Sequence, residues 1–490
     1  MHFMPLFPEG LLTTIAVLIV LFGALIKKSG KISAYLSLIG LIAALVLVAG
    51  TALIPEPAIF FFGTISVDIF SQFFKAVFLI VSLLIVIASM SRYADDPGAD
   101  EFYCLLLFAT VGMMVVASSI DLVTLFIGFE LASLSTYAMA AFDKSKKNLE
   151  AAMKYFIFGS ASSAVMLFGF SLLYGMAYTT NIEGIANVAF TNFSPATIIA
   201  LIFVIAGFAF KMALVPFHMW APDTYEGAPP LVSGMLAAGS KKMGFAAAFR
   251  VILIALVALR FEWYLAFAIL AAITMTLGNL AACWQNNVRR ILAYSSIAQA
   301  GYIAISFVVV GAAAEMVNGY SIAQLGIAGG LLLILGHALM KTGAFIGTAQ
   351  VANMVAKQSD TDPDDISHYA GLGRRAPITA FSMLIFMFAL AGIPPTAGFI
   401  GKFVLFSSAI YSGLLWLAVL AILNSALSLY YYLRIVSYMY LREPAGPKVS
   451  EPKGYVIAIV LTLIAVMWIG IFPQAFIDWA LQAAAVLLPS

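Results

Sequence analysis

The sequence predicts an all-α polytopic membrane protein with about 14 transmembrane helices, including two inverted five-helix repeats that each contain a broken helix. Three observations support this prediction. The chain of 490 residues is 63% hydrophobic and only 10% charged, whereas soluble domains are about one quarter charged. Apolar windows of about 20 residues, the length that crosses a bilayer, recur along the whole chain. The basic residues that lie between these windows fall almost entirely in alternate loops.

Apolar windows and turn signals divide the chain into fourteen expected spans. Several spans exceed a single crossing, so we expect breaks, tilts or interfacial turns within them. The stretch "AIFFFGTIS" at 58–66 is expected to form a short hairpin outside the bilayer. The expected spans are 11–26, 32–53, 69–91, 102–118, 120–141, 150–179, 197–219, 229–258, 263–284, 288–310, 319–353, 376–413, 414–440 and 454–486.

The loops alternate in charge along this series of spans. Sixteen Lys and Arg residues fall on one side of the membrane and only Arg260 falls on the other. By the positive-inside rule the basic side is cytoplasmic. We therefore expect an integral, multi-pass protein of a prokaryotic cell membrane with both termini on the extracytoplasmic side. The sixteen are Lys27, Lys28, Lys31, Arg92, Lys144, Lys146, Lys147, Arg289, Arg290, Lys357, Arg374, Arg375, Arg434, Arg442, Lys448 and Lys453.

The span count also predicts how the chain is organised. Spans 4–8 and 9–13 each number five, and because five is odd, a structural repeat between these groups must be inverted. We expect three N-terminal transmembrane helices in 1–101 and a first five-helix repeat in 102–262. A second, inverted repeat is expected in 263–440, and a C-terminal transmembrane helix in 441–490.

Two spans at matching positions of these groups combine prolines with a lysine. Lys211 precedes Pro216 in "KMALVPFH", and Lys402 follows Pro394 and Pro395 in "GIPPTAGFIGKF". Proline removes a helical hydrogen bond and leaves carbonyls free, which a membrane tolerates only where the backbone faces protein or a wet cavity. Interrupted helices at matching positions of inverted halves indicate a transport pathway.

Five ionisable residues lie too deep in their spans for easy snorkelling: Glu130, Lys211, Lys241, Lys341 and Lys402. Structural ion pairs are the alternative for any one of them. Pairing five buried charges is a poor route to stability, so together they predict a proton relay. Burial disfavours a protonated amine and a nearby carboxylate favours it, so Glu130 is expected to switch the protonation of Lys211.

The remaining charges within spans are interpreted differently. For Lys75 and Lys154, snorkelling or a local ion pair is favoured over function, and Arg250 is ambiguous. Lys242 adjoins Lys241 but faces about 100° away on a helix, so at most one of the two shares the interior face.

Other polar residues are candidates for bridging the lysines. His337 and Lys341 lie four residues apart on one helix face, and His218 follows the first break; histidine shuttles protons near neutral pH. For four polar residues of span 10, ordinary interhelical hydrogen bonding and water binding are equally weighted. Those four are Tyr294, Ser295, Ser296 and Gln299.

The sequence offers no pattern for a redox cofactor. Its two cysteines, Cys104 and Cys283, are far apart and form no CxxC pair, so neither an iron–sulfur nor a zinc site is expected. Nothing predicts a nucleotide cradle, a metal site or nucleic-acid binding. The lipid bilayer is the expected surrounding.

Several stretches resemble the antiporter-like membrane subunits of respiratory complex I and related proton-pumping dehydrogenases. They are "EFYCLLLFATVGMMVVAS", "FIGFELASLSTYAM", "KMALVPFHMWAPDTYEGAPPLVSGMLAAGSKKMGF", "RRILAYSSIAQAGY" and "GIPPTAGFIGKF". Within that family, "PFHMWAPDTYEGAP" is similar to the N-type subunit, called subunit 2 in mitochondria. The L-type, M-type and Mrp antiporter chains usually continue "PFHxWLPxAH".

The resemblance implies a fold and a set of roles. It implies fourteen helices with two inverted repeats, a switching pair of Glu130 and Lys211, a central relay at Lys241, and a second half-channel at Lys402. The pair His337 and Lys341 departs from many bacterial N-type chains and is similar to the L and M types, which favours a role for Lys341.

The resemblance also implies a function. We expect a proton-translocating, non-redox subunit of a pump of the NADH:quinone oxidoreductase type, an enzyme of the translocase class. Flavin, iron–sulfur clusters and a quinone-type acceptor are expected in partner subunits of the membrane and electron-transfer arms. Three alternatives stay open: a subunit of an archaeal deazaflavin-dependent or photosynthetic ferredoxin-dependent homologue, a stand-alone Na⁺/H⁺ antiporter subunit, and a scaffold that has lost transport.

Overall fold

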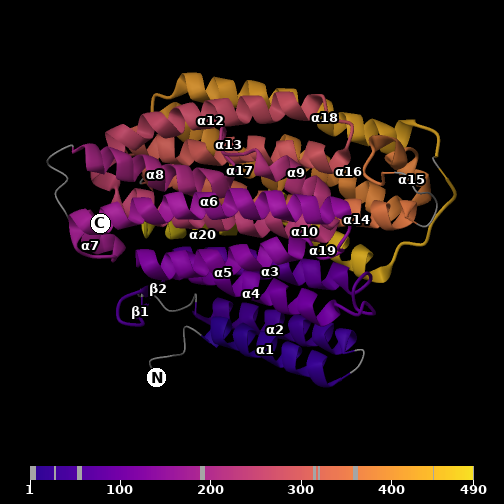
Figure 1. Ribbon diagram of the computed structural model, residues 1–490. Coiled ribbons are helices and arrows are strands. Elements are labelled where there is room, and N and C mark those ends of the chain that lie inside the picture. The colour runs from indigo at the N-terminus through magenta and orange to yellow at the C-terminus, as the bar shows by residue number, and fades with distance from the viewer. Residues whose placement is uncertain are drawn as a thin grey trace.

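The computed structural model shows a bundle of helices that lie side by side with nearly parallel axes (Figure 1). It describes residues 7–26, 29–51, 58–187, 194–312, 316–317, 320–356, 362–444 and 446–488. Within these residues, twelve helices are long and apolar enough to cross a membrane. Two further expected spans are built from shorter helical segments, so each of the fourteen spans coincides with helical structure.

The N-terminal part forms one edge of the bundle, coloured indigo in Figure 1. The expected hairpin at 58–66 is confirmed as an antiparallel pair of short strands, in which Ala58 lies opposite Val67. Asp68 then caps the following helix, because its side chain accepts a hydrogen bond from the backbone of Ser71. These elements are α1 (Phe7–Leu25), α2 (Gly30–Thr51), β1 (Ala58–Phe60), β2 (Ile65–Val67) and α3 (Ile69–Ser89).

The next five expected spans include the first broken helix. In span 7 the helix α8 ends at Met212, before Pro216, and α9 begins at Trp220, one residue after the predicted end of the span. Span 8 is a run that alternates between α- and π-helical geometry. The elements are α4 (Ala99–Ser118), α5 (Leu122–Ala140), α6 (Lys146–Ala177), α7 (Ile182–Ala186), α8 (Pro195–Met212), α9 (Trp220–Gly227), α10 (Pro230–Met235), η2 (Leu236–Ser240), α11 (Lys241–Arg250), η3 (Val251–Ala255) and η4 (Val257–Leu259).

The following five expected spans include the second broken helix. Span 12 divides into α16 and α17 at the two prolines. The elements are α12 (Arg260–Cys283), α13 (Val288–Ala312), β3 (Met316–Val317), β4 (Tyr320–Ser321), α14 (Ile322–Val355), η5 (Ile366–Tyr369), α15 (Leu372–Arg375), α16 (Pro377–Ala391), α17 (Ala397–Tyr411) and α18 (Leu415–Leu441). The last expected span divides into α19 (Lys453–Ile471) and α20 (Gln474–Ala485).

Two helices of the second group, α13 and α14, lie inside the bundle. Most residues of α13 and α14 are buried, whereas α1 and α6 leave most of their surface exposed. Glycines let these central helices approach closely: a Cβ at Gly301 would lie 2.5 Å from the backbone nitrogen of Met275, and one at Gly329 would lie 2.6 Å from that of Leu405. The long helices α13 and α14, which carry many of the polar candidates from the sequence, are therefore enclosed by the other spans.

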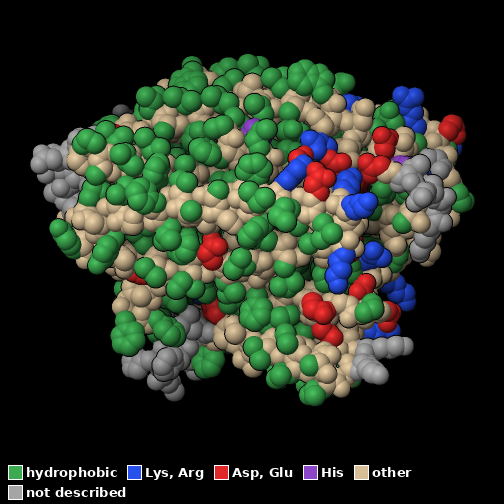
Figure 2. Space-filling model, viewed as in Figure 1, with side chains coloured by type: hydrophobic (Ala, Val, Ile, Leu, Met, Phe, Trp, Pro, Cys, Tyr) green, Lys and Arg blue, Asp and Glu red, His purple; other side chains and the backbone are tan. Residues whose placement is uncertain are grey.

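Charge is distributed unevenly over the surface. Figure 2 shows Lys and Arg side chains gathered at one end of the molecule, near α15 of Figure 1, while much of the rest of the visible surface is hydrophobic. This is the distribution that a membrane-embedded bundle with one basic end would have. Of the sixteen residues predicted for that side, Lys27, Lys28 and Lys357 lie outside the described part of the chain.

Candidate functional site

Glu130 lies in the middle of α5 and is half-buried. The hydroxyl of Ser163 on α6 donates a hydrogen bond of 2.5 Å to its Oε1. Ser163 was not singled out in the sequence, so this donor was missed. A hydroxyl donor of this kind holds a carboxylate in place without neutralising its charge.

Lys211 lies in the last turn of α8 and is buried. Its Nζ donates hydrogen bonds to the hydroxyls of Ser133 (2.9 Å) and Tyr155 (3.3 Å). The ammonium also lies over the ring of Phe129, 5.2 Å from its centroid. The site is tightly enclosed, because a Cβ at Gly244 would lie 3.1 Å from the Cβ of Lys211.

The predicted switching pair is not in direct contact in this state. Among the described residues, no ion pair within 4.0 Å joins Glu130 to Lys211. Lys211 instead binds Ser133, which lies one helical turn beyond Glu130 on the same helix. Glu130 and the hydroxyl that Lys211 binds are therefore one turn apart on α5.

Lys241 is fully buried at the start of α11. Its Nζ donates a hydrogen bond of 3.0 Å to Ser296 on α13 and lies 5.5 Å from the ring centroid of Tyr225. A polar link runs back towards Lys211, because the hydroxyls of Tyr155 and Ser240 are 3.5 Å apart and Ser240 directly precedes Lys241.

Lys341 is fully buried in the middle of α14. Its Nζ donates to the hydroxyl of Ser295 (2.7 Å) and to the carbonyl of Leu292 (2.8 Å). Ser295 also bonds to the hydroxyl of Tyr432 on α18. Because Ser295 and Ser296 are adjacent on α13, Lys241 and Lys341 bind neighbouring hydroxyls of one helix.

Lys402 occupies the second helix break. Its Nζ donates to the carbonyls of Leu390 (3.0 Å) and Ala391 (2.9 Å) and to the hydroxyl of Ser425 (2.8 Å). Leu390 and Ala391 end α16, where backbone carbonyls have no helical partner and a cation is favourable. Gln299 donates to the same Leu390 carbonyl, at 2.9 Å, and so links α13 to this site.

The two breaks place a lysine at corresponding helix ends. Lys211 belongs to the last turn of α8, and Lys402 reaches back from α17 to the last turn of α16. The prediction that the breaks leave backbone carbonyls available beside the lysines is confirmed at Lys402. At the first break, the indole of Trp220 donates instead to the Phe210 carbonyl, at 2.8 Å. We refer to Lys211, Lys241, Lys341 and Lys402 as the lysine row.

The two histidine candidates lie at different parts of the row. His218 is mostly buried in the turn after Pro216, and its Nδ1 has no hydrogen-bond partner among the described residues. His337 is fully buried on α14, and neither of its ring nitrogens has a partner within the described chain.

Three other cations form buried or partly exposed ion pairs. Lys75 lies 2.7 Å from Glu9 of α1, which confirms the ion pair favoured for it. Arg250 lies 2.7 Å from Asp68, which resolves its ambiguity towards an ion pair. Lys154 contacts Glu150 at 2.8 Å and Asp223 at 3.0 Å, as its interpretation also favoured.

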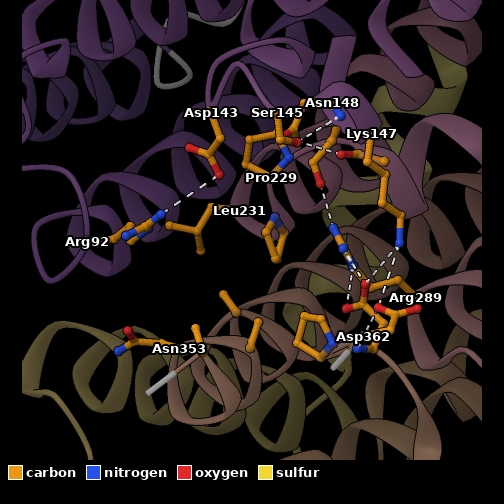
Figure 3. A pocket seen from close by; sticks show the side chains of 18 of the residues that line it. Arg92, Asp143, Ser145, Lys147, Asn148, Pro229, Leu231, Arg289, Asn353 and Asp362 are labelled. Atoms are coloured by element: carbon orange, nitrogen blue, oxygen red, sulfur yellow. Dashed lines mark hydrogen bonds and ion pairs between the residues drawn. The ribbon is translucent and has the colours of Figure 1, made fainter. Parts of the chain in front are cut away.

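A cavity of about 550 Å³ opens near the basic end of the molecule (Figure 3). Its rim carries ion pairs, including Lys147 with Asp362 at 3.7 Å and Arg289 with the buried Asp364. Leu231 of α10 and Ala349 of α14 also line it. The cavity therefore reaches between the helices that lead to Lys241 and Lys341.

The hydroxyl partners of the row were largely missed by sequence reasoning. Of the hydroxyls that a lysine of the row binds, those of Ser295 and Ser296 were singled out, but those of Ser133, Tyr155 and Ser425 were not. Serines and tyrosines are common in membrane helices, so only their position opposite a buried lysine distinguishes them. Tyr155, which directly follows Lys154, carried no separate signal in the sequence.

Taken together, the fold and the site define an integral, multi-pass membrane protein with ionisable groups enclosed between its helices. Residues 119–428 match the family described as "NADH:quinone oxidoreductase/Mrp antiporter, TM". This range includes Glu130, both histidine candidates and the whole lysine row. The chain belongs to this family.

The similarity to individual relatives extends over nearly the whole chain. The chain is 49% identical to F(420)H(2) dehydrogenase subunit N of Methanosarcina mazei, with 99% of each chain covered. It is 39% identical to NADH-quinone oxidoreductase subunit N of Trichlorobacter lovleyi, with 98% of this chain and 96% of the relative covered. A chain of respiratory complex I from Thermus thermophilus is 30% identical, with a TM-score of 0.80, covering 96% of this chain and 98% of that one.

Proposed function

We propose that this chain is a proton-translocating membrane-arm subunit of a complex I-like redox pump. The observation that carries the proposal is the lysine row, whose members bind hydroxyls and carbonyls of α5, α6, α13, α16 and α18. Each lysine in the row binds groups that accept a hydrogen bond and carry no negative charge. Such a lysine is free to exchange its proton, unlike a cation held by a carboxylate.

In this proposal Glu130, Lys211, Lys241, Lys341 and Lys402 carry the protons, with His218 and His337 in support. Movement of Glu130 towards Lys211 favours a proton on Lys211, and its withdrawal releases that proton towards Ser240 and Lys241. The adjacent hydroxyls of Ser296 and Ser295 connect Lys241 to Lys341. Residues 102–262 and 263–440 form the two inverted repeats that supply the two half-channels.

The chain would contribute no redox chemistry of its own. Its partners are the other membrane-arm subunits, and flavin, iron–sulfur clusters and a quinone-type acceptor belong to partner chains. We place the basic end on the cytoplasmic side and both termini on the extracytoplasmic side, since the positive-inside rule gives this orientation.

The relatives favour one of the open alternatives for the electron donor. The relative at 49% identity is named as a subunit of F(420)H(2) dehydrogenase, and the relative at 39% as a subunit of NADH-quinone oxidoreductase. The higher identity favours an F(420)H(2) dehydrogenase, which corresponds to the deazaflavin-dependent alternative.

The test uses membrane vesicles that contain the assembled complex with Lys211→Met. Vesicles are given NADH in one experiment and F420H2 in the other, and proton uptake is measured per electron transferred. We expect one donor to drive uptake in the wild type, and uptake per electron to fall in the variant because methionine cannot bind a proton. The exposed Lys144→Met serves as the control and should match the wild type. Undiminished pumping by an assembled Lys211→Met complex would refute the proposal.

A further inference from the structure

Three buried aromatic side chains lie between Lys211 and Lys241. The indole of Trp220 is stacked on the ring of Tyr155, with centroids 4.7 Å apart and planes 14° from parallel, and it meets the ring of Tyr225 edge-on at 5.8 Å. Tyr155 binds Lys211 through its hydroxyl, and the ammonium of Lys241 lies over the ring of Tyr225. We refer to Tyr155, Trp220 and Tyr225 as the aromatic cluster. The cluster therefore contacts both lysines of the first half of the row.

The hydroxyl of Tyr155 is the point at which Lys211 meets the chain next to Lys241. It accepts a hydrogen bond of 3.3 Å from Nζ of Lys211, and it lies 3.4 Å from the hydroxyl of Thr136 and 3.5 Å from that of Ser240, which directly precedes Lys241. A phenolic hydroxyl both donates and accepts, so it can take up one proton while it releases another. These distances are long for hydroxyl hydrogen bonds. A small movement of the ring therefore opens or closes the connection.

Trp220 ties the position of this ring to the first helix break. It is the first residue of α9, and its Nε1 donates a hydrogen bond of 2.8 Å to the carbonyl of Phe210 in the last turn of α8. Carbonyls at a helix end have no helical partner, and at the second break Lys402 takes such carbonyls instead. The indole therefore bridges the two halves of the broken helix, while its face supports the ring of Tyr155. A change in the shape of the break moves Trp220 and with it the Tyr155 hydroxyl.

Lys242, the neighbour of Lys241, does not share this arrangement. Both lysines are fully buried, because α11 is enclosed on all sides, so the expectation that only one shares the interior does not describe α11. Nζ of Lys242 has no hydrogen-bond partner among the described residues and lies 5.8 Å from the ring centroid of Phe245 on its own helix. Of the two, Lys241 is therefore the one that the aromatic cluster joins to Lys211.

We propose that Tyr155 passes protons between Lys211 and Lys241, and that Trp220 is the positioning residue that holds the Tyr155 phenol in place for this transfer. In the step, an Nζ–H bond of the Lys211 ammonium breaks and the proton binds the Tyr155 oxygen, which gives its own proton to the hydroxyl of Ser240. Ser240 passes a proton on in the same way, and an N–H bond forms on the neutral amine of Lys241. Each oxygen gains one proton and loses one, so no oxidant or other reactant is required.

This inference rests on the proposed function and names the groups that join its first two lysines. An aromatic cluster also fills space between helices, and that packing needs only the rings. The transfer needs the Tyr155 oxygen and the indole N–H of Trp220 as well. Substitutions that keep a ring but remove one of these groups therefore separate the two roles.

The experiment uses vesicles that contain the whole complex with Tyr155→Phe, Trp220→Phe or both changes. Redox-driven proton uptake is measured in H2O and in D2O at a constant rate of electron transfer. We expect Tyr155→Phe to slow uptake by at least about tenfold, because a phenyl ring cannot carry a proton. Trp220→Phe should slow uptake and increase the ratio of the rates in H2O and D2O, because a misplaced phenol makes proton transfer the slowest step. The double variant should be no slower than Tyr155→Phe alone, because Trp220 acts through Tyr155.

Two matched controls lie outside the row and the aromatic cluster. Trp263 is fully buried and its indole donates a hydrogen bond of 2.8 Å to the carbonyl of Leu256, the same kind of contact that Trp220 makes. Tyr103 is fully buried and its hydroxyl accepts a hydrogen bond of 3.2 Å from Ser89. Trp263→Phe and Tyr103→Phe should keep the wild-type uptake and the wild-type isotope ratio in the complexes that assemble.

Normal uptake by assembled Tyr155→Phe would overturn the proposal. A double variant slower than Tyr155→Phe alone, or an unchanged isotope ratio in Trp220→Phe, would overturn the positioning role of Trp220. Equal losses in the two controls would show that packing, and not proton transfer, is responsible. If Trp220→Phe fails to assemble, Trp220→Tyr, which also keeps a ring and lacks the indole N–H, takes its place with the same expectation. Loss of uptake in Lys211→Met together with normal uptake in Tyr155→Phe would refute this inference and leave the proposed function standing.

Discussion

At the scale of single residues, the protein separates two kinds of buried charge. Lys75 and Arg250 meet carboxylates and hold helices together, whereas the lysine row meets hydroxyls and carbonyls. The sequence identified which charged residues lie far from the ends of their spans, but not which groups they bind. Partners such as Tyr155 and Ser425 come from helices far away in sequence, so only the three-dimensional packing reveals them.

The charge of Glu130 is testable by itself. Glu130→Gln keeps an oxygen that accepts the hydrogen bond from Ser163 but removes the negative charge that would attract the proton of Lys211. We expect normal assembly and redox-driven proton uptake that is slower by at least about tenfold. The measurement is proton uptake by vesicles in which the rate of electron transfer is held constant. Glu183→Gln, the same change at an exposed carboxylate, should have no effect.

At the scale of elements, the two broken helices bring lysines to helix ends. The prolines predicted both breaks and their positions to within a few residues. The sequence did not predict which carbonyls would be used, because this depends on the path of the chain between the two halves of each helix. At the second break Gly392 makes the turn, with a positive φ of 91°.

Gly392→Ala is expected to disturb Lys402. The left-handed conformation would cost the alanine about 1–3 kcal/mol, and its Cβ would lie 2.9 Å from Cδ of Lys402. The ammonium should move away from Leu390 and Ala391, and proton uptake per electron should fall. Gly413→Ala provides the control, because Gly413 also has a positive φ, of 77°, but a Cβ there meets no atom within 4 Å. Equal effects of both changes on proton uptake would mean that backbone strain, and not the contact with Lys402, is responsible.

Phe345 of α14 lies one turn from Ala349, which lines the cavity at the basic end, on the side towards Lys341. It is fully buried, lies against Gly234 of α10, and its ring is 5.9 Å from that of Tyr225, over which Lys241 sits. Phe345→Ala should therefore connect the cavity to Lys241 through water and allow a proton leak. We expect faster passive collapse of an imposed pH gradient across vesicles in the absence of any electron donor. An unchanged leak rate in the assembled variant would show that Phe345 is not the barrier.

At the scale of the whole molecule, the sequence predicted the architecture well. Each of the fourteen predicted apolar windows coincides with helical structure. A segment that spans the bilayer must satisfy its own backbone hydrogen bonds, so an apolar window of this length predicts a helix. The central burial of α13 and α14 was not predicted, since nearly every span is apolar on all faces. The inversion of the two five-helix groups remains a prediction from their odd number and the matching breaks.

Ion pairs at the basic end join the two groups of spans, as Arg290 does with Asp223 and Glu226. A neighbouring buried ion pair within the second group is testable as a stabilising contact. Arg289 at the start of α13 binds the buried Asp364 and also donates to the carbonyl of Ala228, at 2.5 Å. Asp364→Asn would leave the guanidinium buried without its counter-charge, a loss that costs about 3–5 kcal/mol. We expect the solubilised complex to lose its native size at a lower temperature, as measured by size-exclusion chromatography after heating. The exposed pair Arg374–Glu443, 3.9 Å apart, is the control: Glu443→Gln should leave that temperature unchanged, because exposed pairs contribute little. If both changes had the same small effect, the Arg289–Asp364 contact would not be a stabilising one.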